Sequence, residues 1–153
     1  MPPPVLIAEP AMLAALVQSV PDAVNAIVKE FWPGPLTVIL KAQEGLNMDL
    51  GETAGTVAVR VPDDDAARQL LRELGPLAVS SANISGHDAA TTCEQAREML
   101  GDSVAVYLDG GPSRIAVAST IVDFATSGEG RIVRTGVISA EQLHLSAPED
   151  LDA

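Results

Sequence analysis

Short apolar runs separated by polar turns recur along this 153-residue chain. The clearest is Thr56–Val61, in which β-branched residues alternate with other side chains, a pattern typical of a strand with one buried face. Further strands are expected at Val5–Ala8, Leu36–Leu40, Leu77–Ser80, Val104–Leu108, Ser119–Phe124 and Arg131–Arg134. The chain is therefore predicted to be rich in short strands.

Helices are predicted where apolar residues recur at a spacing of three to four. One begins at Pro21-Asp22 and ends before Pro33, because proline lacks the N–H donor that a helix interior needs. Others are expected after Pro10, over Ala66–Leu74 behind an N-cap at Asp63 or Asp64, up to Leu100 behind an N-cap at Thr91 or Thr92, and over Ala140–Leu143.

The order of these elements indicates the fold class. Strands and helices both recur, but only the turn at 127–130 separates the last two predicted strands. Strict alternation of strand and helix therefore fails. An α/β fold of α+β character, with a mixed sheet and flanking helices, fits better than a fully parallel sheet. Leu70, Leu71 and Leu74 are expected to face its core.

Composition excludes several classes of protein. The net charge is −12 and the nine Lys and Arg residues are scattered, which argues against strong direct binding of RNA, because such binding needs a basic patch. The single cysteine, Cys93, excludes an internal disulfide and a multi-cysteine metal site. No apolar run approaches the roughly 20 residues of a membrane-spanning helix. These features predict a cytoplasmic protein without a membrane partner.

Arg60 interrupts the otherwise apolar strand Thr56–Val61. Because side chains alternate across a strand, Val59 and Val61 point to one face and Arg60 to the other. The guanidinium could simply face solvent. It could equally be a bidentate clamp for a carboxylate or a phosphate. The pattern alone leaves both interpretations open.

Hydroxyl, amide and guanidinium side chains also occur at the ends of other predicted strands. Ser80–Gly86 follows one strand and Ser119-Thr120 opens another, and ligands in α/β sheets gather at strand ends. For Ser80–Gly86, composition alone favours an ordinary polar turn. Arg134 closes the last strand and either binds phosphates or is a solvated edge charge. The pattern thus indicates an α/β domain that could bind an anion, without indicating a reaction.

Several motifs occur in a fixed order, and each is modest by itself. They are Phe31–Thr37 (FWPGPLT), Thr56–Pro62 (TVAVRVP), Ser81–Gly86 (SANISG), Ser119–Asp123 (STIVD) and Ile132–Gly136 (IVRTG). Their order and spacing together resemble the YrdC-like, Sua-type threonylcarbamoyl-AMP synthase family, from about Pro4 to Leu143. The resemblance implies a YrdC-like domain over 1–143, with an acidic tail at 144–153. It also implies a twisted mixed sheet with helices around an open cavity.

The resemblance further implies an enzyme, an L-threonylcarbamoyladenylate synthase of the nucleotidyltransferase class. Such an enzyme joins L-threonine, bicarbonate and ATP into threonylcarbamoyl-AMP and releases pyrophosphate, and Mg²⁺ accompanies the nucleotide. A threonylcarbamoyl-transferase complex then modifies an adenosine of tRNA, so tRNA is an indirect partner. A homodimer is a further expectation.

Roles carry over from the family residue by residue. Contacts to ATP are implied for Thr56, Ser81, Asn83 and Arg134. Contacts to threonine are implied for Arg60, which would hold the carboxylate, for the backbone at Val79, and for Ser119. No residue is assigned as a certain catalytic group or as a protein ligand to a metal. Arginines that clamp carboxylate and phosphate agree in kind with the strand pattern described above.

The chain also departs from the family pattern. Family members begin with a strand that carries a Pro-Thr-x-Thr-x-Tyr-Gly-like motif and then a Lys-x-Arg motif, neither of which precedes Met1-Pro2-Pro3-Pro4 here. A truncated chain with reduced stability, dimerisation or inactivity is therefore expected. Two other interpretations stay open. One is a non-catalytic nucleotide- or RNA-associated binding module, and the other is the carbamoyl-transfer version of the fold in hydrogenase maturation proteins.

Overall fold

The computed structural model describes residues 2–114 and 117–145. The chain forms two compact units. Met1–Val79 and Ala118–Ala153 make up the first unit, and Ser80–Val117 makes up the second. All strands within the described ranges belong to the first unit, and the second contains an α-helix, a short 3-10 helix and loops.

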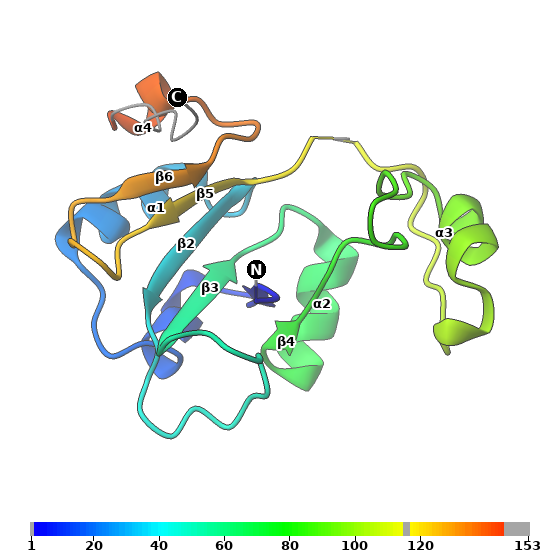
Figure 1. Cartoon of the computed structure of the whole chain (residues 1–153), viewed down its shortest axis with the longest axis horizontal. Coiled ribbons are helices and arrows are strands. Elements are labelled where there is room, and N and C mark those ends of the chain that lie inside the picture. The colour runs from blue at the N-terminus through cyan, green and yellow to red at the C-terminus, as the bar shows by residue number, and fades with distance from the viewer. Residues whose placement is uncertain (1, 115–116, 146–153) are drawn as a thin grey trace. The chain divides into compact units, whose positions relative to one another are not determined.

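A six-stranded mixed sheet organises the first unit, with the strand order β4-β1-β3-β2-β5-β6 (Figure 1). β1 runs parallel to β3 and β2 runs parallel to β5, while the other neighbouring pairs are antiparallel. The strands are β1 (Val5–Leu6), β2 (Leu36–Lys41), β3 (Thr56–Arg60), β4 (Leu77–Ala78), β5 (Thr120–Asp123) and β6 (Arg131–Arg134). The predicted α/β fold with a mixed sheet is confirmed.

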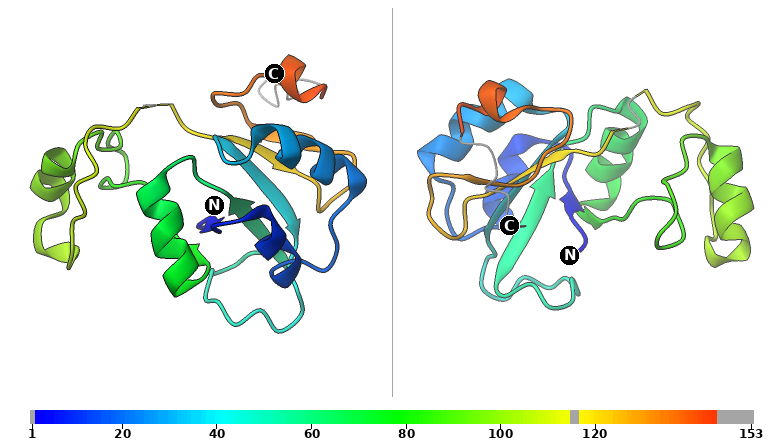
Figure 2. Two further views of the ribbon diagram at one scale, coloured as in Figure 1. Left: turned by 180° about the vertical axis from the view of Figure 1, so that it is seen from behind. Right: turned by 45° about the horizontal axis from the view of Figure 1, so that its top comes forward.

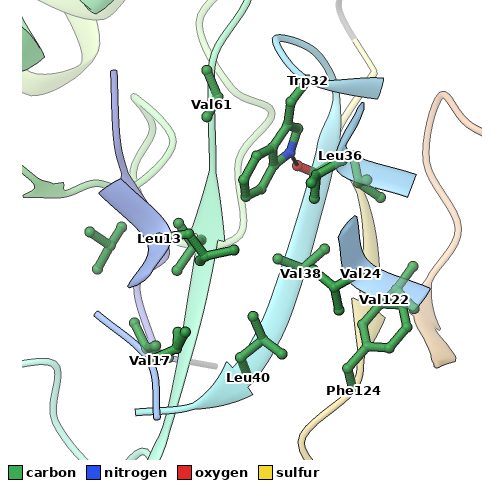
Figure 3. Packing of buried hydrophobic residues seen from close by; sticks show 14 of the residues in the cluster. Leu13, Val17, Val24, Trp32, Leu36, Val38, Leu40, Val61, Val122 and Phe124 are labelled. Carbon is green, nitrogen blue, oxygen red and sulfur yellow. Dashed lines mark hydrogen bonds between the residues drawn. The ribbon is translucent and has the colours of Figure 1, made fainter. Parts of the chain in front are cut away.

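One face of this sheet is covered by the 3-10 helix η1 (Pro10–Ala15) and by α1 (Asp22–Phe31), which lie on the same side in both views of Figure 2. Leu13 and Val24 from these helices belong to one buried cluster with Val38 of β2 (Figure 3). Burial of each such aliphatic side chain contributes roughly 1.5–3 kcal/mol. The helix predicted after Pro10 is thus a 3-10 helix.

The helix α2 (Asp65–Leu74) is attached to the segment that follows β1 by charged side chains. Arg68 donates from Nε to the carbonyl oxygen of Ala8 at 2.9 Å. Arg68 and Arg72 both form salt bridges with Glu9, at 2.8 and 2.6 Å. A hydrogen bond from Arg72 is the largest cause that lowers the pKa of the Glu9 carboxyl. These pairs therefore fix where α2 lies beside β1.

Only one of the three leucines expected to face the core from α2 does so. Leu71 is 2% exposed, whereas Leu70 and Leu74 are 37% and 64% exposed. The helix packs against the unit through a narrow apolar stripe. The helix face beside this stripe carries Arg68 and Arg72, which bind Glu9. The prediction was right for Leu71 and wrong for Leu70 and Leu74.

The second unit contains α3 (Cys93–Leu100) and a short 3-10 helix, η2 (Gly101–Ser103). The strand predicted at Val104–Leu108 is wrong, because no strand forms there and the side chain of Leu108 is 75% exposed. Within this segment, Tyr107 donates its hydroxyl to the Gly101 carbonyl at 2.7 Å. A β-branched run becomes a strand only where another strand pairs with it.

The chain from β6 onward ends in the short helix α4 (Ala140–Leu143), where Ser139 and Gln142 form a capping box. Apart from its first two residues, the expected acidic tail at 144–153 lies outside the described residues. In the described ranges, no helix is long and apolar enough to cross a membrane.

Thr120 is the main polar group inside the first unit. Its side chain is fully buried, donates to the carbonyl of Ile138 at 2.7 Å, and accepts from the N–H groups of Gly136 and Ile138 at 2.9 and 3.0 Å. A Cβ at Gly136 would collide with the backbone of Ala118 to Thr120. One hydroxyl therefore fixes the chain after β6 against the start of β5.

Replacement of Thr120 by valine keeps the shape of the side chain but leaves two N–H groups and one carbonyl without this partner. We expect the free energy of unfolding to fall by roughly 2–4 kcal/mol. Urea titration followed by circular dichroism measures this loss. The control is Thr135→Val, at an exposed position, which should change stability by less than about 0.5 kcal/mol. Equal stability of both variants would contradict the role of Thr120.

Candidate functional site

The face of the sheet opposite η1 and α1 is half-exposed and carries most of the candidate side chains. Along β3, Val57 and Val59 are buried on the covered face, while Thr56, Ala58 and Arg60 alternate with them and are only partly buried. We call this second face of the sheet the open face. It is the surface on which a ligand could lie against strands.

Arg60 stands at the end of β3 on the open face. Its Nε donates to the carbonyl oxygen of Gly34 at 2.9 Å, and the N–H of Gly34 donates to the carbonyl of Val61 at 2.9 Å. A Cβ at position 34 would collide with the Phe31 carbonyl. Gly34 therefore lies close to β3, and its carbonyl holds the guanidinium of Arg60 through Nε.

Ser119, which precedes β5, contacts Arg134, the last residue of β6. Arg134 donates from Nε and Nη2 to the Ser119 carbonyl, at 3.1 and 2.9 Å, and from Nη2 to the Ser119 hydroxyl at 3.1 Å. The Ser119 hydroxyl also lies 2.8 Å from the hydroxyl of Thr37, which is only 2% exposed. The hydroxyl of Ser119 is thus held from two sides.

The segment from Gly34 to Thr37 joins these groups. Gly34 holds Arg60 through its carbonyl, the Pro35 carbonyl accepts from the N–H of Thr120 at 3.0 Å, and Thr37 contacts Ser119. At the start of the segment, Trp32 donates from Nε1 to the Leu36 carbonyl at 2.8 Å inside the core, as Figure 3 shows. The segment from Gly34 to Thr37 therefore positions both Arg60 of β3 and Ser119, the residue before β5.

A bulge brings Arg134 to the open face. Ile121 of β5 pairs with Arg134, whereas the next residue, Val122, pairs with Ile132, so β6 contains one extra residue at Val133. Thr37 is in register with Ile121 on the other side. Thr37, Ile121 and Arg134 therefore form one row across three strands. Without the bulge, Arg134 would fall on the face of Ile132, which is buried.

Among the described residues, Arg60 and Arg134 have no carboxylate partner. Within residues 2–114 and 117–145, the salt bridges use other arginines. Burial, and after it the charge of Arg134, lowers the pKa of Arg60. The guanidinium nonetheless stays charged, so folding places this charge where it is electrostatically unfavourable. A bound carboxylate or phosphate would relieve that cost and could accept bidentate hydrogen bonds. We call Arg60, Ser119 and Arg134 the anion cluster.

Two other residues with implied roles also lie in the first unit. Thr56 stands four positions before Arg60 on β3, about 13 Å along the strand. Its hydroxyl donates to the Thr53 carbonyl at 2.7 Å, so toward a ligand it can act as an acceptor. The N–H of Val79 donates to the Pro4 carbonyl at 2.9 Å, so a backbone contact from Val79 to a ligand would use its carbonyl.

Ser81 and Asn83 belong to the second unit. Ser81 is exposed. Asn83 donates from Nδ2 to the carbonyls of Ile84 and His87, at 3.0 and 3.1 Å, and so shapes the loop. Its Oδ1 is buried and accepts no hydrogen bond from the described residues. Asn83 therefore organises the Ser81–Gly86 loop, and its oxygen still lacks a donor.

The sequence pattern indicates no role for Gly34 or Thr37. The motif Phe31–Thr37 points to function only through the family resemblance. A proline-rich turn between a helix and a strand is an ordinary chain reversal, so nothing in the pattern indicates that its carbonyl and hydroxyl groups reach two other strands. The one available signal was a threonine at the start of an otherwise apolar run.

Residues 1–136 match the model of the Sua5_yciO_yrdC family, which carries the description "Telomere recombination". The chain belongs to this family. The YrdC-like resemblance noted from the motifs is therefore confirmed.

Relatives within the family are similar over most of this chain. A Mycobacterium tuberculosis protein named as a candidate threonylcarbamoyl-AMP synthase is 47% identical over 143 residues, which cover 94% of this chain and 65% of the relative. The threonylcarbamoyl-AMP synthase of Bacillus subtilis is 37% identical over 139 residues, with coverage of 90% and 40%. The chain thus spans less than two thirds of the length of these curated relatives.

A solved structure agrees with this assignment. Sua5 of P. abyssi, complexed with L-threonine, has a TM-score of 0.87 to this chain at 33% sequence identity. The match covers 94% of this chain and 42% of that one. The mixed sheet described above is therefore the sheet of this family.

Pyrophosphate should bind the anion cluster and raise the melting temperature of the protein. A concentration of 100 times the Kd adds about 2.7 kcal/mol of stability. We expect the increase to be lost in Arg60→Gln and Arg134→Gln. Arg131→Gln removes the same charge from the same strand. Arg131 is exposed like Arg134 but forms a salt bridge with Asp123, so this variant should keep the increase. Equal loss in all three variants, measured by scanning fluorimetry, would indicate nonspecific attraction instead.

Proposed function

We propose that this chain carries out threonylcarbamoyl-AMP synthesis, in which L-threonine, bicarbonate and ATP give threonylcarbamoyl-AMP, pyrophosphate and water. The observation that carries the proposal is the anion cluster. Two arginines and a hydroxyl converge there with no carboxylate of the described chain to neutralise them. The threonine complex of Sua5 and the names of the curated relatives support the same reaction.

Arg60 would hold the carboxylate of threonine. Its Nε is used by Gly34, so the two terminal nitrogens of the guanidinium would bind the carboxylate as a fork. Ser119 and the carbonyl of Val79 would complete the threonine contacts. With the carboxylate fixed, the amine of threonine takes up bicarbonate, loses water and becomes a carbamate. The carbamate oxygen then attacks the α-phosphorus of ATP, and pyrophosphate leaves.

Arg134 would bind the phosphates of ATP, with Thr56 as a further nucleotide contact. For Ser81 and Asn83, which belong to the second unit, a nucleotide contact stays a prediction. Charge that develops on the phosphate oxygens during transfer is stabilised by guanidinium groups already in place. Mg²⁺ would enter on the nucleotide. Among the described residues, no group of three or more His, Cys, Asp or Glu side chains could hold a metal ion. We propose that the chain contributes positioning and charge stabilisation.

The product would act on tRNA only through a second protein complex. A chain with a net charge of −12 is poorly suited to bind nucleic acid directly, because phosphate groups need cationic partners. We therefore propose a cytoplasmic enzyme that hands threonylcarbamoyl-AMP to a transferase. A homodimer would be compatible with this role.

The reaction is tested by pyrophosphate release. We expect release to require L-threonine, bicarbonate and ATP together. A chain that binds ATP and threonine in calorimetry but releases no pyrophosphate would instead support a non-catalytic binding module. Absence of both binding and release would reject the proposed function for this chain.

The division of labour within the anion cluster is tested separately. Arg60→Gln should weaken threonine binding by roughly 10- to 100-fold, as expected for a lost charged hydrogen bond of about 1.5–3 kcal/mol. Arg134→Gln should weaken ATP more than threonine. Arg131→Gln, the charge-matched control, should change neither affinity by more than about twofold. Equal losses for both ligands in both variants, measured by calorimetry, would reject this assignment.

A further inference from the structure

Thr37 has no part in the proposed function, although it is buried beside the anion cluster. Its hydroxyl lies 2.8 Å from the hydroxyl of Ser119, and Thr37 and Ser119 are 2% and 8% exposed. Distance alone does not say which of the two hydroxyls donates. The hydrogen bonds around them decide it.

The first constraint comes from Arg134. A guanidinium has donors and no acceptor, so the contact at 3.1 Å means that Arg134 donates to the oxygen of Ser119. A hydroxyl oxygen accepts up to two hydrogen bonds and donates one. Ser119 can therefore still accept one bond and donate one.

The second constraint comes from Thr37. Within the described part of the chain, the hydroxyl of Ser119 is the hydrogen-bond partner of the Thr37 hydroxyl. If Ser119 donated to Thr37, the proton of Thr37 would be buried without an acceptor, which is disfavoured by about 1–3 kcal/mol. Thr37 must therefore donate to Ser119, and both lone pairs of the Ser119 oxygen are then occupied.

We propose that Thr37 is a positioning residue that turns the hydroxyl of Ser119 into an obligate hydrogen-bond donor toward the amino-acid substrate. This inference rests on the proposed function. The outward O–H matches a carboxylate oxygen, which can only accept. The ammonium group of the same amino acid finds no acceptor at Ser119. Thr37 thereby fixes the orientation in which threonine binds, with its carboxylate at Arg60 and Ser119 and its amine free for bicarbonate.

Substitutions at Thr37 test the proposal through affinity for L-threonine. Thr37→Val keeps the shape but cannot donate, and should weaken threonine by about tenfold, the effect of one hydrogen bond of about 1.4 kcal/mol. Thr37→Ser restores the donor and should bind within about threefold of wild type. Melting temperatures of all variants separate this effect from loss of structure. Wild-type affinity in Thr37→Val would overturn the proposal.

A double-mutant cycle shows whether Thr37 acts through Ser119. Ser119→Ala should weaken threonine, and adding Thr37→Val to it should cause no further loss, because the hydroxyl that Thr37 orients is already absent. Additive losses in the double variant would mean that Thr37 acts by another route. That result would overturn the proposal.

Whether Thr37 or Ser119 donates in their hydrogen bond can also be measured without substrate. In the unliganded protein, NMR should detect a slowly exchanging hydroxyl proton on Thr37, and Thr37→Val should remove it. A protected hydroxyl proton on Ser119, with a rapidly exchanging one on Thr37, would overturn the proposal. If wild-type protein failed to bind threonine while the Thr37 proton was protected, the proposed function would fail and the hydrogen-bond direction would stand.

Discussion

The site depends on the polar backbone of one short segment, Gly34 to Thr37. This segment follows Trp32, which is buried in the core, and its carbonyl and hydroxyl groups contact two different strands. The Gly34 carbonyl is fixed in the backbone and the Thr37 hydroxyl is buried, so the guanidinium of Arg60 and the hydroxyl of Ser119 are held before any ligand arrives. Preorganisation of this kind lowers the entropy that a ligand must lose on binding.

The same arrangement carries an electrostatic cost. In a strongly acidic chain, Arg60 is partly buried near Arg134 and has no carboxylate partner among the described residues. Arg68 and Arg72, by contrast, each form a salt bridge with Glu9, so both have a carboxylate partner. The anionic ligand that we propose would account for a cation left unpaired at the end of a strand, since the ligand would offset this cost when it binds.

How far the sequence predicts this structure depends on how local each feature is. The alternation around Arg60 predicted its face correctly, because strand periodicity is local. The segment Val104–Leu108 has the same alternation and forms no strand, since pairing is decided by distant partners. The face of Arg134 follows from a bulge at Val133, and the role of Thr37 follows from a neighbour 82 positions away. Neither the bulge nor this contact can be predicted from the local sequence pattern.

A crystal structure of this chain with L-threonine tests the central claim most directly. We predict that the substrate carboxylate lies against the guanidinium of Arg60 and accepts a hydrogen bond from the Ser119 hydroxyl, with the amine pointing away from both. A threonine bound elsewhere on the chain, or bound with its ammonium at Ser119, would contradict the account.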